Sequence, residues 1–269
     1  GGRGMRMADP WQDYEMIQQI GKGSYGRVYS ARARHGIHGS LVAVKAVELE
    51  DDGSAGELTA EVMSEVETLR QCHHANVLVF MGAYMHSRVL YLVTELCAAG
   101  SLLDLMRARR RGLSEGQLGA AVAATTSALV YLHSMHITHR DIKAANLLLT
   151  AQGIVRLADF GVSVQVASTL ALHSTAIGTP HWMAPEVIQD GEYDERADVW
   201  SLGITAIELI EERPPHWELR PVMRALFRIP SAPPPTLSNP QAFSPQLGDW
   251  LGAALRKEPK ERATAASLA

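Results

Sequence analysis

The sequence predicts an α+β fold in which a small antiparallel sheet, with one key helix beside it, precedes a larger and mainly helical part. Up to Glu95, the chain consists mainly of short β-type runs separated by glycine-containing and polar turns, with one helical segment at Glu57–Cys72. From Ser101 onward, the segments have helical character instead. A length of 269 residues suits one large domain or two lobes that share a cleft.

Composition restricts the class of protein further. The hydrophobic fraction of 46% and the charged fraction of 20% are ordinary for a soluble globular protein. A net charge of −4 does not suggest a surface for nucleic acid or for a membrane. The sequence has no apolar run long enough to span a bilayer and no secretory signal at its start. Cys72 and Cys97 give neither a disulfide framework nor zinc spacing, so a cytoplasmic location is expected.

The first strand is expected from Tyr14 to Ile20, after a tail or cloning remnant at residues 1–13. It leads into Gly-Lys-Gly-Ser-Tyr-Gly-Arg-Val at residues 21–28, where glycines would let backbone N–H groups approach phosphate oxygens. This pattern alone is weak, because glycine-rich hairpins without a ligand are equally common. The strand-like run from Val28 argues against a dinucleotide fold, which would continue into a helix. A Walker phosphate loop is excluded, because no Gly-Lys-Ser/Thr closes the pattern.

A lysine, Lys45, lies within the apolar β run Leu41–Val47. Alone it would be interpreted as an edge lysine that reaches water, since burying an unpaired ammonium is costly. The helical spacing of Glu57–Cys72 offers a partner, because Glu61 and Glu65 lie four residues apart on one face. We prefer Glu65, which stands just before the next turn, and Glu61 stays open.

Two more strands, Val77–Met85 and Val89–Glu95, complete the predicted sheet. Residues 95–100 form a linker whose backbone could form hydrogen bonds with the edge of an adenine ring. Within it, Cys97 also has the simpler interpretation of a small buried hydrophobic residue. The first helix after Ser101 should end in the basic run of residues 107–111, which favours the helix dipole. A capping box at residues 114–117 should then open a long helix that ends near residue 135.

The strongest chemical signal is His-Arg-Asp-Ile-Lys-Ala-Ala-Asn at residues 139–146, followed by Asp-Phe-Gly at residues 159–161. Asp141 can take or orient a hydroxyl proton, and Lys143 can face a transferred phosphate. Asn146 and Asp159 supply hard oxygen atoms for magnesium. This combination suits phosphoryl transfer from a metal–nucleotide, in which the protein mainly positions the reactants and neutralises charge.

Together these motifs resemble the eukaryotic protein kinase family from Tyr14 to the C-terminus. The matching segments are residues 21–28, Val-Ala-Val-Lys at 42–45, residues 139–146, residues 159–161, Ala-Pro-Glu at 184–186, Asp-Val-Trp-Ser-Leu-Gly at 198–203, and Arg262. Lys143, two residues after Asp141, resembles serine/threonine rather than tyrosine kinases. Residues 178–188 resemble the sterile-twenty group. Residues 221–236 are similar to germinal-centre kinases, and within these the chain is closest to the Hippo (mammalian sterile-twenty-like) kinases.

The resemblance implies a bilobal protein kinase fold, with an N-lobe at residues 14–95, a hinge at 96–100 and a C-lobe at 101–269 whose last helix is expected to be truncated. It implies ATP and Mg²⁺ as cofactors, and a protein substrate with a Ser/Thr acceptor. The residues implied to contact the nucleotide, with Thr94 as gatekeeper, are Ile20, Gly21, Gly23, Gly26, Val28, Ala43, Thr94, Glu95, Cys97 and Leu148.

The resemblance also implies the chemical roles. Asp141 would be the catalytic base, assisted by Lys143. Lys45 would hold the α- and β-phosphates and would be fixed by Glu65. The magnesium ligands would be Asn146 and Asp159. Structural roles are implied for Leu69, His139 and Phe160, as a hydrophobic stack, and for Glu186 and Arg262, as a buried ion pair.

Regulation is implied by position as well. Thr175 stands where family members are phosphorylated, and its phosphate could pair with Arg140 and order the segment. Ser174 is a lesser candidate. Thr179 would instead contact the catalytic residues and shape the substrate site. A homodimer for trans-autophosphorylation is a further expectation.

Two other functions stay open from the sequence alone. A pseudokinase or scaffold would keep the fold without turnover, but the residues that turnover needs are all present: Lys45, Asp141, Asn146 and Asp159. A phosphotransferase for small molecules would share the catalytic logic. The long segment between Asp159 and Ala184, with Gly-Thr-Pro near its end, favours a peptide substrate instead.

Overall fold

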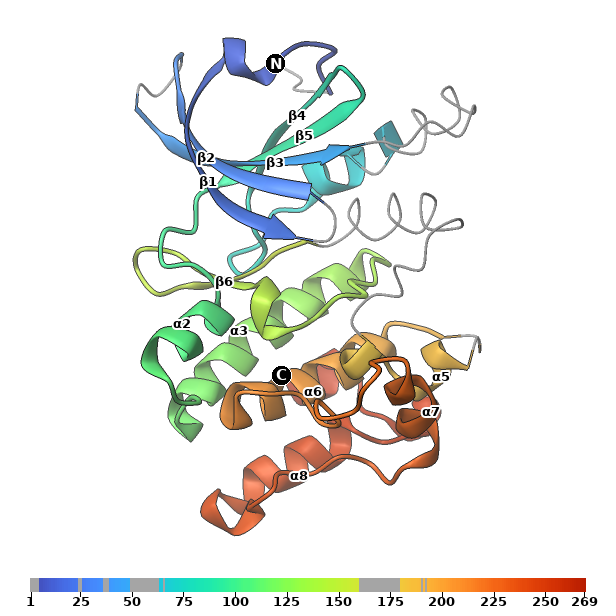
Figure 1. Cartoon of the computed structure of the whole chain (residues 1–269). Helices are drawn as coiled ribbons and strands as arrows, with labels where there is room; N and C mark the ends of the chain where they lie inside the picture. The colour runs from blue at the N-terminus through green and yellow to red at the C-terminus, as the bar shows by residue number, and fades with distance from the viewer. Residues whose placement is uncertain are drawn as a thin grey trace. The chain divides into compact units, whose positions relative to one another are not determined.

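The computed structural model describes residues 5–23, 26–35, 39–48, 63–64, 66–159, 180–189, 191 and 193–269. These residues divide into two compact units, one that ends at Ala98 and one that begins at Ala99. The first contains the strands labelled β1–β5 in Figure 1, and the second contains most of the helices. The prediction of an α+β fold, with an antiparallel sheet followed by a mainly helical part, is confirmed.

The first unit is built on a five-stranded antiparallel sheet in the order β1-β2-β3-β5-β4. Its strands are β1 (Tyr14–Gly23), β2 (Gly26–Ala33), β3 (Leu41–Glu48), β4 (Phe80–His86) and β5 (Val89–Glu95). β4 begins at Phe80 rather than at Val77 as predicted. The reason is local, because the Val79 N–H bonds to the Glu95 carboxylate and not to a backbone carbonyl. Residues 63–64 and 66–71 are helical, as the spacing predicted.

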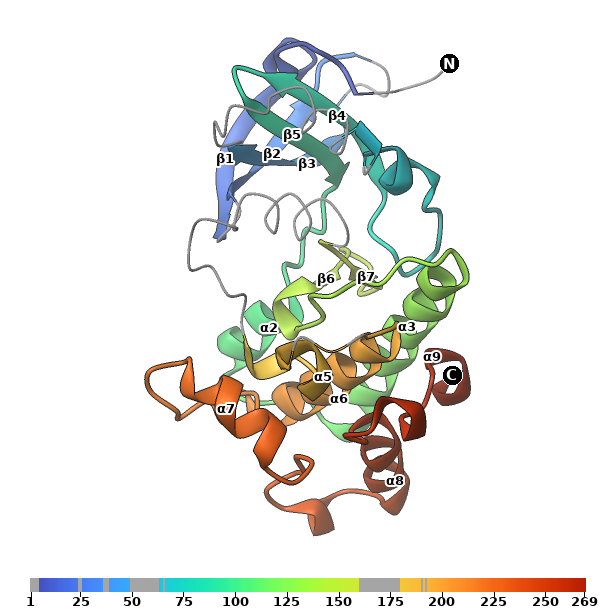
Figure 2. The same ribbon diagram turned by 90° about the vertical axis from the view of Figure 1, so that its right-hand side faces the viewer.

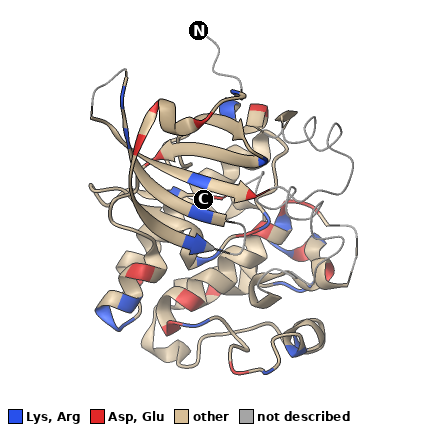
Figure 3. Cartoon of the chain, turned by 45° about the horizontal axis from the view of Figure 1, so that its top comes forward, with Lys and Arg blue, Asp and Glu red and all other residues tan. Residues whose placement is uncertain are grey.

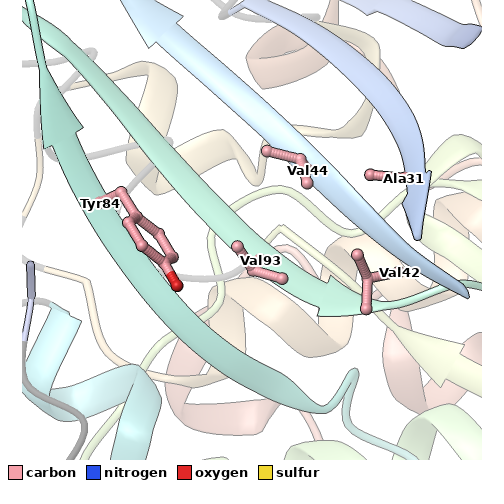
Figure 4. Close-up of a cluster of buried hydrophobic side chains, with 5 residues drawn as sticks. All are labelled: Ala31, Val42, Val44, Tyr84 and Val93. Carbon is pink, nitrogen blue, oxygen red and sulfur yellow. The ribbon is translucent and has the colours of Figure 1, made fainter. Parts of the chain in front are cut away.

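One face of this sheet carries a buried apolar cluster of Ala31, Val42, Val44, Tyr84 and Val93 (Figure 4). The register explains the cluster, because Ala31 pairs with Val42 and Val44 pairs with Val93. Directly paired residues lie on the same face, and so do residues two apart along a strand. Burying each side chain of valine size contributes about 1.5–3 kcal/mol. The alternation of β-branched residues along β3 therefore supplies one wall of a core.

Residues before Tyr14 pack against this same face. Arg6 pairs with β4 through two backbone hydrogen bonds of 2.9 and 2.8 Å, as a short parallel neighbour. The Trp11 ring meets Tyr29 and Tyr91 edge to face, with centroid distances of 5.8 and 5.9 Å. These contacts differ from the expectation of a tail at residues 1–13, because an indole and a backbone pairing hold the segment on the sheet.

The second unit is organised around a central helix, α6. Its helices are α2 (Leu102–Arg109), α3 (Glu115–Ser134), α5 (Pro185–Ile188), α6 (Arg196–Glu211), α7 (Arg224–Ser231), α8 (Pro245–Ala254) and α9 (Ala265–Leu268). It also holds the 3-10 turns η2 (Ala144–Asn146) and η4 (Pro180–Trp182), and the paired strands β6 (Leu147–Leu149) and β7 (Val155–Leu157). Every residue of α6 from Ala197 to Leu209 is buried, because α2, α3, α8 and η4 pack around it (Figure 2).

The predicted helix signals of this unit are confirmed. The Ser114 hydroxyl accepts the Gln117 N–H, and the Gln117 carboxamide accepts the Ser114 N–H, which is the capping box at the start of α3. α2 ends in the basic run, with Arg110 as its C-cap at a φ of 51°. Both basic and acidic positions are spread over the ribbon in Figure 3, in keeping with the small net charge. Of the helices that the structure describes, none has the length and apolar character needed to cross a bilayer.

Candidate active site

A buried carboxylate of α6 anchors residues 139–146, the loop that carries the predicted catalytic residues. The Asp198 carboxylate accepts the backbone N–H groups of His139 and Arg140, each at 2.8 Å. His133 Nε2 lies 2.9 Å from the same carboxylate. Arg140 has a φ of 69°, which residues other than glycine rarely adopt. The two bonds to Asp198 therefore hold a strained residue directly before the candidate base.

The same face of α6 supports this loop at two more points. Thr205 Oγ1, which donates to the Ser201 carbonyl at 2.7 Å, also lies 3.2 Å from the Ile142 carbonyl oxygen, and Glu208 Oε2 accepts the Ala144 N–H at 3.0 Å. Asp198, Thr205 and Glu208 are spaced near whole helical turns, so they lie along one side of the helix. All three are buried. A single helix face thus fixes the loop from its beginning to its end.

Asp141, Lys143 and Asn146 are brought into direct contact by this support. Lys143 Nζ donates to both carboxylate oxygens of Asp141 at 2.8 Å. Asn146 Nδ2 donates to the Asp141 carbonyl at 2.7 Å and to its Oδ2 atom at 2.9 Å. The Asp141 side chain keeps 23% exposure, whereas Asn146 is buried. The carboxylate is oriented by an ammonium and an amide, and it stays reachable by a hydroxyl from outside.

His139 ties the loop to the end of β7 as a neutral ring. Its Nδ1 atom accepts the Asp141 N–H at 3.2 Å, and its Nε2 atom lies 3.0 Å from the Ala158 carbonyl oxygen. Because a carbonyl only accepts, the proton is on Nε2. The ring is fully buried, and this burial lowers the pKa of His139, in agreement with the neutral form.

The β6–β7 hairpin places Asn146 and Asp159 at the same end. Leu147 pairs with Leu157, and the Ala158 N–H donates to the Asn146 carbonyl at 2.9 Å. Asn146 directly precedes β6, and Asp159 follows β7 with a φ of 64°. Amide and carboxylate oxygens are ligands that Mg²⁺ prefers. The hairpin therefore gathers a donor set that suits magnesium.

In the first unit, the register places predicted nucleotide-binding residues on the face opposite the apolar cluster. Val28 pairs with Lys45, and Ala43 pairs with Thr94. Since Ala43 and Lys45 are two residues apart on β3, all four share one face. Val44, which lies between them in sequence, belongs to the cluster on the other face. Lys45 and its neighbours are thus placed together by strand alternation alone.

The glycine-rich turn has a steric reason for one of its glycines. Gly23 pairs with Gly26 across the turn, and Gly21 lies earlier on β1. Gly26 has a φ of 138°, and a Cβ atom there would lie 2.0 Å from the Ala46 carbonyl oxygen. A glycine is therefore required for the close approach of β2 to β3. Ile20, just before the turn, leaves 46% of its surface exposed.

Three further predicted nucleotide contacts, Glu95, Cys97 and Leu148, lie at the end of the first unit and in the second unit. Glu95 exchanges two bonds of 3.0 Å with Val79, one through its backbone N–H and one through its carboxylate. Cys97 is a partly buried cysteine of the first unit. Leu148 belongs to the second unit, where it pairs with Arg156 in the β6–β7 ladder.

Several predicted residues lie outside the described part of the chain. These are Glu65 and its alternative Glu61, Phe160 and Gly161, and the three hydroxyl residues Ser174, Thr175 and Thr179. The pairing of Lys45 with Glu65 and the role of Thr175 therefore stay predictions. Arg140 is described, and its guanidinium lies 5.8 Å from the ring centroid of Tyr193.

The predicted ion pair between Glu186 and Arg262 is confirmed. The two guanidinium nitrogens donate to the two carboxylate oxygens at 2.6 and 2.9 Å. Both side chains are buried, and Arg262 also donates to the carbonyls of Arg196, Arg256 and Lys257. Such a bidentate pair fixes direction as well as distance. It locks the start of α5 to the segment after α8.

Sequence reasoning gave no role to the polar residues on α6. Asp198 was recognised only as part of a motif, and Glu208 was not singled out. A signal was present, because each is an acid within a helical run that is mostly apolar, and a buried acid needs partners. The sequence could not show that these partners lie about sixty residues away, in the catalytic loop.

Comparison with known proteins shows what this chain is similar to. Residues 14–269 match the family model described as protein kinase domain. The chain is 44% identical over 259 residues to the serine/threonine-protein kinase cst-1 of Caenorhabditis briggsae, and equally to the protein of that name from Caenorhabditis elegans. The alignments cover 96% of this chain but 51% and 50% of these relatives, respectively. The chain thus spans about half the length of the curated relatives it matches.

Proposed function

The chain belongs to the protein kinase domain family, as its motifs predicted, and we propose that it is an active serine/threonine protein kinase that uses Mg-ATP. It transfers the γ-phosphoryl group to a hydroxyl of a protein substrate. The observation that carries this proposal is the bonded set of Asp141, Lys143 and Asn146. The names of both relatives support the serine/threonine class, as does the position of Lys143.

Asp141 is the residue that receives or orients the proton of the acceptor hydroxyl. Its carboxylate is held by Lys143 and Asn146 and is partly open to the outside. A general base contributes to catalysis first by lying within hydrogen-bond distance of the hydroxyl, and only then through its pKa. Lys143 already lies at this carboxylate, so it can also neutralise charge on the transferred group.

Asn146 and Asp159 are the residues that would hold magnesium. Both described Asn146 side-chain bonds use the NH₂ group, which leaves the carbonyl oxygen as a donor for a hard cation. Within the described residues, no three His, Cys, Asp or Glu side chains form a metal site of their own. A magnesium ion held by these two residues would take its other ligands from phosphates and water, which suits a metal–nucleotide. The ion would neutralise charge on the phosphates.

The first unit would supply the nucleotide contacts. Lys45 would bind the α- and β-phosphates and pair with Glu65. The other nucleotide contacts are proposed for Ile20, Gly21, Gly23, Gly26, Val28, Ala43, Thr94, Glu95, Cys97 and Leu148, the last from the second unit. Support comes from the shared sheet face of Val28, Ala43, Lys45 and Thr94.

Regulation is proposed to act through Thr175. Its phosphorylation, in trans between two copies, would supply a doubly charged group for Arg140 and order the segment. We further propose a cytoplasmic location and a role in a Hippo-like or stress signalling cascade.

The regulatory proposal can be tested by mutation. Replacing Thr175 by Ala should lower kinase activity without changing ATP binding. Equal activity of this variant after full phosphatase treatment and re-incubation with ATP would contradict the regulatory role.

A direct assay tests the proposed function. The purified chain should phosphorylate Ser/Thr peptides on an array with Mg-ATP, and Asp141→Asn should lower kcat by about 10³-fold or more, since the positioned base is lost. Asp249→Asn, on the exposed side of α8, is the matched control. A chain that binds Mg-ATP but transfers no phosphate, with Asp141→Asn identical to it, would instead indicate a pseudokinase or scaffold.

A further inference from the structure

Glu208 of α6 joins two segments that are far apart in the sequence. Its Oε2 atom accepts the Ala144 N–H at 3.0 Å and the Trp182 indole N–H at 2.9 Å. Ala144 directly follows Lys143 in the catalytic loop, and Trp182 closes η4, two residues before Ala184. One oxygen atom thus holds both the loop with the catalytic residues and the segment with the Ala-Pro-Glu motif.

Trp182 is held by α6 at its backbone as well. Ser201 Oγ donates to the Trp182 carbonyl at 2.7 Å, so α6 contacts the backbone of Trp182 as well as its indole. Both side chains on α6 are buried, and so is Trp182. The position of Trp182 is therefore set by α6, and the shared carboxylate oxygen of Glu208 links it to the catalytic loop.

The environment of this carboxylate is unusual for an acid. Glu208 is almost completely buried, and the two groups that donate to Oε2 are neutral N–H groups. Burial raises the pKa of Glu208 to about 7, while the two N–H donors and the charges of Lys143 and Arg107 lower it. A side chain selected for stability alone would not need a charge here, because burying a carboxylate without a bonded cation is costly.

We propose that Glu208 is a positioning residue, which in its ionised form couples the catalytic loop to the segment of Trp182. Ionised acceptors form shorter and stronger hydrogen bonds than neutral ones, so the charge tightens both links at once. This inference rests on the proposed kinase function, because it concerns the geometry around Asp141 during phosphoryl transfer. The acceptor hydroxyl and ATP contact other residues, so Glu208 acts through Ala144 and Trp182.

The stability of the protein should show the cost of this charge. The folded pKa of Glu208 lies above its ordinary value of 4.5, so the folded state binds the proton more tightly than the unfolded state does. This contribution stabilises the fold at low pH and is lost as the pH rises through about 7. Glu208→Gln should therefore melt at a higher temperature than the parent at pH 8 and at about the same temperature at pH 4, below the ordinary pKa of 4.5. A purely structural carboxylate would give a lower melting temperature in the variant at pH 8.

Kinetics separate positioning from folding. Glu208→Gln should lower kcat about tenfold at pH 8 with the KM for ATP unchanged, because a neutral amide oxygen accepts less strongly. The parent should lose kcat as the pH falls through about 7, and the variant should lack this acidic limb. Glu211→Gln is the matched control, since its carboxylate also accepts two bonds, from Ser238, near the end of the same helix.

Two donor variants keep the test open if Glu208→Gln does not fold. Trp182→Phe removes the indole N–H. Ala144→Pro removes the other donor, at the first position of η2, after a residue with extended backbone, where proline fits. Each should lower kcat, and Trp182→Phe combined with Glu208→Gln should cost less than the product of the single effects. Multiplicative effects would contradict the coupling.

Hydrogen exchange of the Ala144 amide tests the link made by Glu208 independently of kinase activity. At pH 8, the Ala144 N–H should exchange faster in Glu208→Gln than in the parent and in Glu211→Gln. If the parent phosphorylates its substrate and Glu208→Gln retains its kcat, pH profile and exchange rate, the inference is overturned and the proposed function stands. If the parent transfers no phosphate, the proposed function fails, and faster exchange in Glu208→Gln would still establish the link.

Discussion

Each of the two units of this protein is stabilised internally by a different kind of contact. In the first unit, the sheet packs Val42, Val44 and Val93 on one face, and among its described residues the only buried polar side chain is Ser30. In the second unit, α6 alone buries Asp198, Ser201, Thr205 and Glu208. The sheet is thus stabilised mainly by apolar area, whereas α6 is a buried scaffold for hydrogen bonds.

This difference reflects what each contact can specify. Apolar burial is roughly proportional to area and has little directional preference, so the sheet needs only the correct alternation of side chains. Hydrogen bonds require defined distances and angles, so the face of α6 can fix the backbone of the catalytic loop. A buried polar network is costly when one member is removed. The comparison predicts that changes in α6 affect activity and stability together, while changes in the sheet affect mainly stability.

The largest effect is expected from Asp198→Ala. It removes an acceptor shared by the N–H groups of His139 and Arg140 and by the His133 ring. Leaving these groups buried without a partner should lower the free energy of unfolding by about 3–5 kcal/mol. Activity should be lost in the fraction that remains folded. Urea unfolding and a kinase assay at low temperature measure both. The exposed Asp194→Ala is the control, and a folded, fully active Asp198→Ala would refute the role of α6.

A smaller effect, on stability alone, is expected from Trp11→Ala. The indole packs edge to face on Tyr29 and Tyr91 beside the apolar cluster. Because Trp11 is only partly buried, the loss should be about 2 kcal/mol, below the range for a core tryptophan. kcat should stay within about twofold of the parent. Thermal unfolding and the peptide assay test this. A large loss of kcat without loss of stability would remove the distinction between the two regions.

The smallest effect is a gain, from His181→Phe in η4. His181 is buried against Trp182 and Trp217, and its two ring nitrogens form no hydrogen bond of full geometry with the described residues, although the His216 backbone lies near the ring. Phenylalanine should stabilise the protein by about 1 kcal/mol at neutral pH, because no polar atom is left unsatisfied.

The pH dependence of His181→Phe gives a second readout. Burial lowers the pKa of His181, so the unfolded state takes up the proton first as the pH falls below 6.5. The parent should therefore lose stability on acidification below that pH, and the variant should lose less. Melting curves between pH 5 and pH 8 measure the difference. An unchanged slope would indicate that His181 finds a partner in the folded protein.

The sequence predicted what depends on local patterns. The apolar β run Leu41–Val47 predicted the strand that carries Lys45, and Ser114 with Gln117 predicted the start of α3. The contacts of Asp198 and Glu208 could not be predicted in this way, since their partners are set by the packing of α6 and not by neighbouring residues. The same holds for Arg6 and Trp11, which acquire a function only once the sheet exists.

The pairing of Arg6 with β4 has a consequence for association between molecules. β4 is the last strand in the sheet order, so its outer backbone groups would otherwise be open to pairing with another chain. The short parallel neighbour at Arg6 occupies two of these groups. Versions of the protein that begin at Tyr14 would expose this edge, together with the ring surfaces that Trp11 covers. We expect such versions to aggregate at concentrations at which the longer chain remains dispersed.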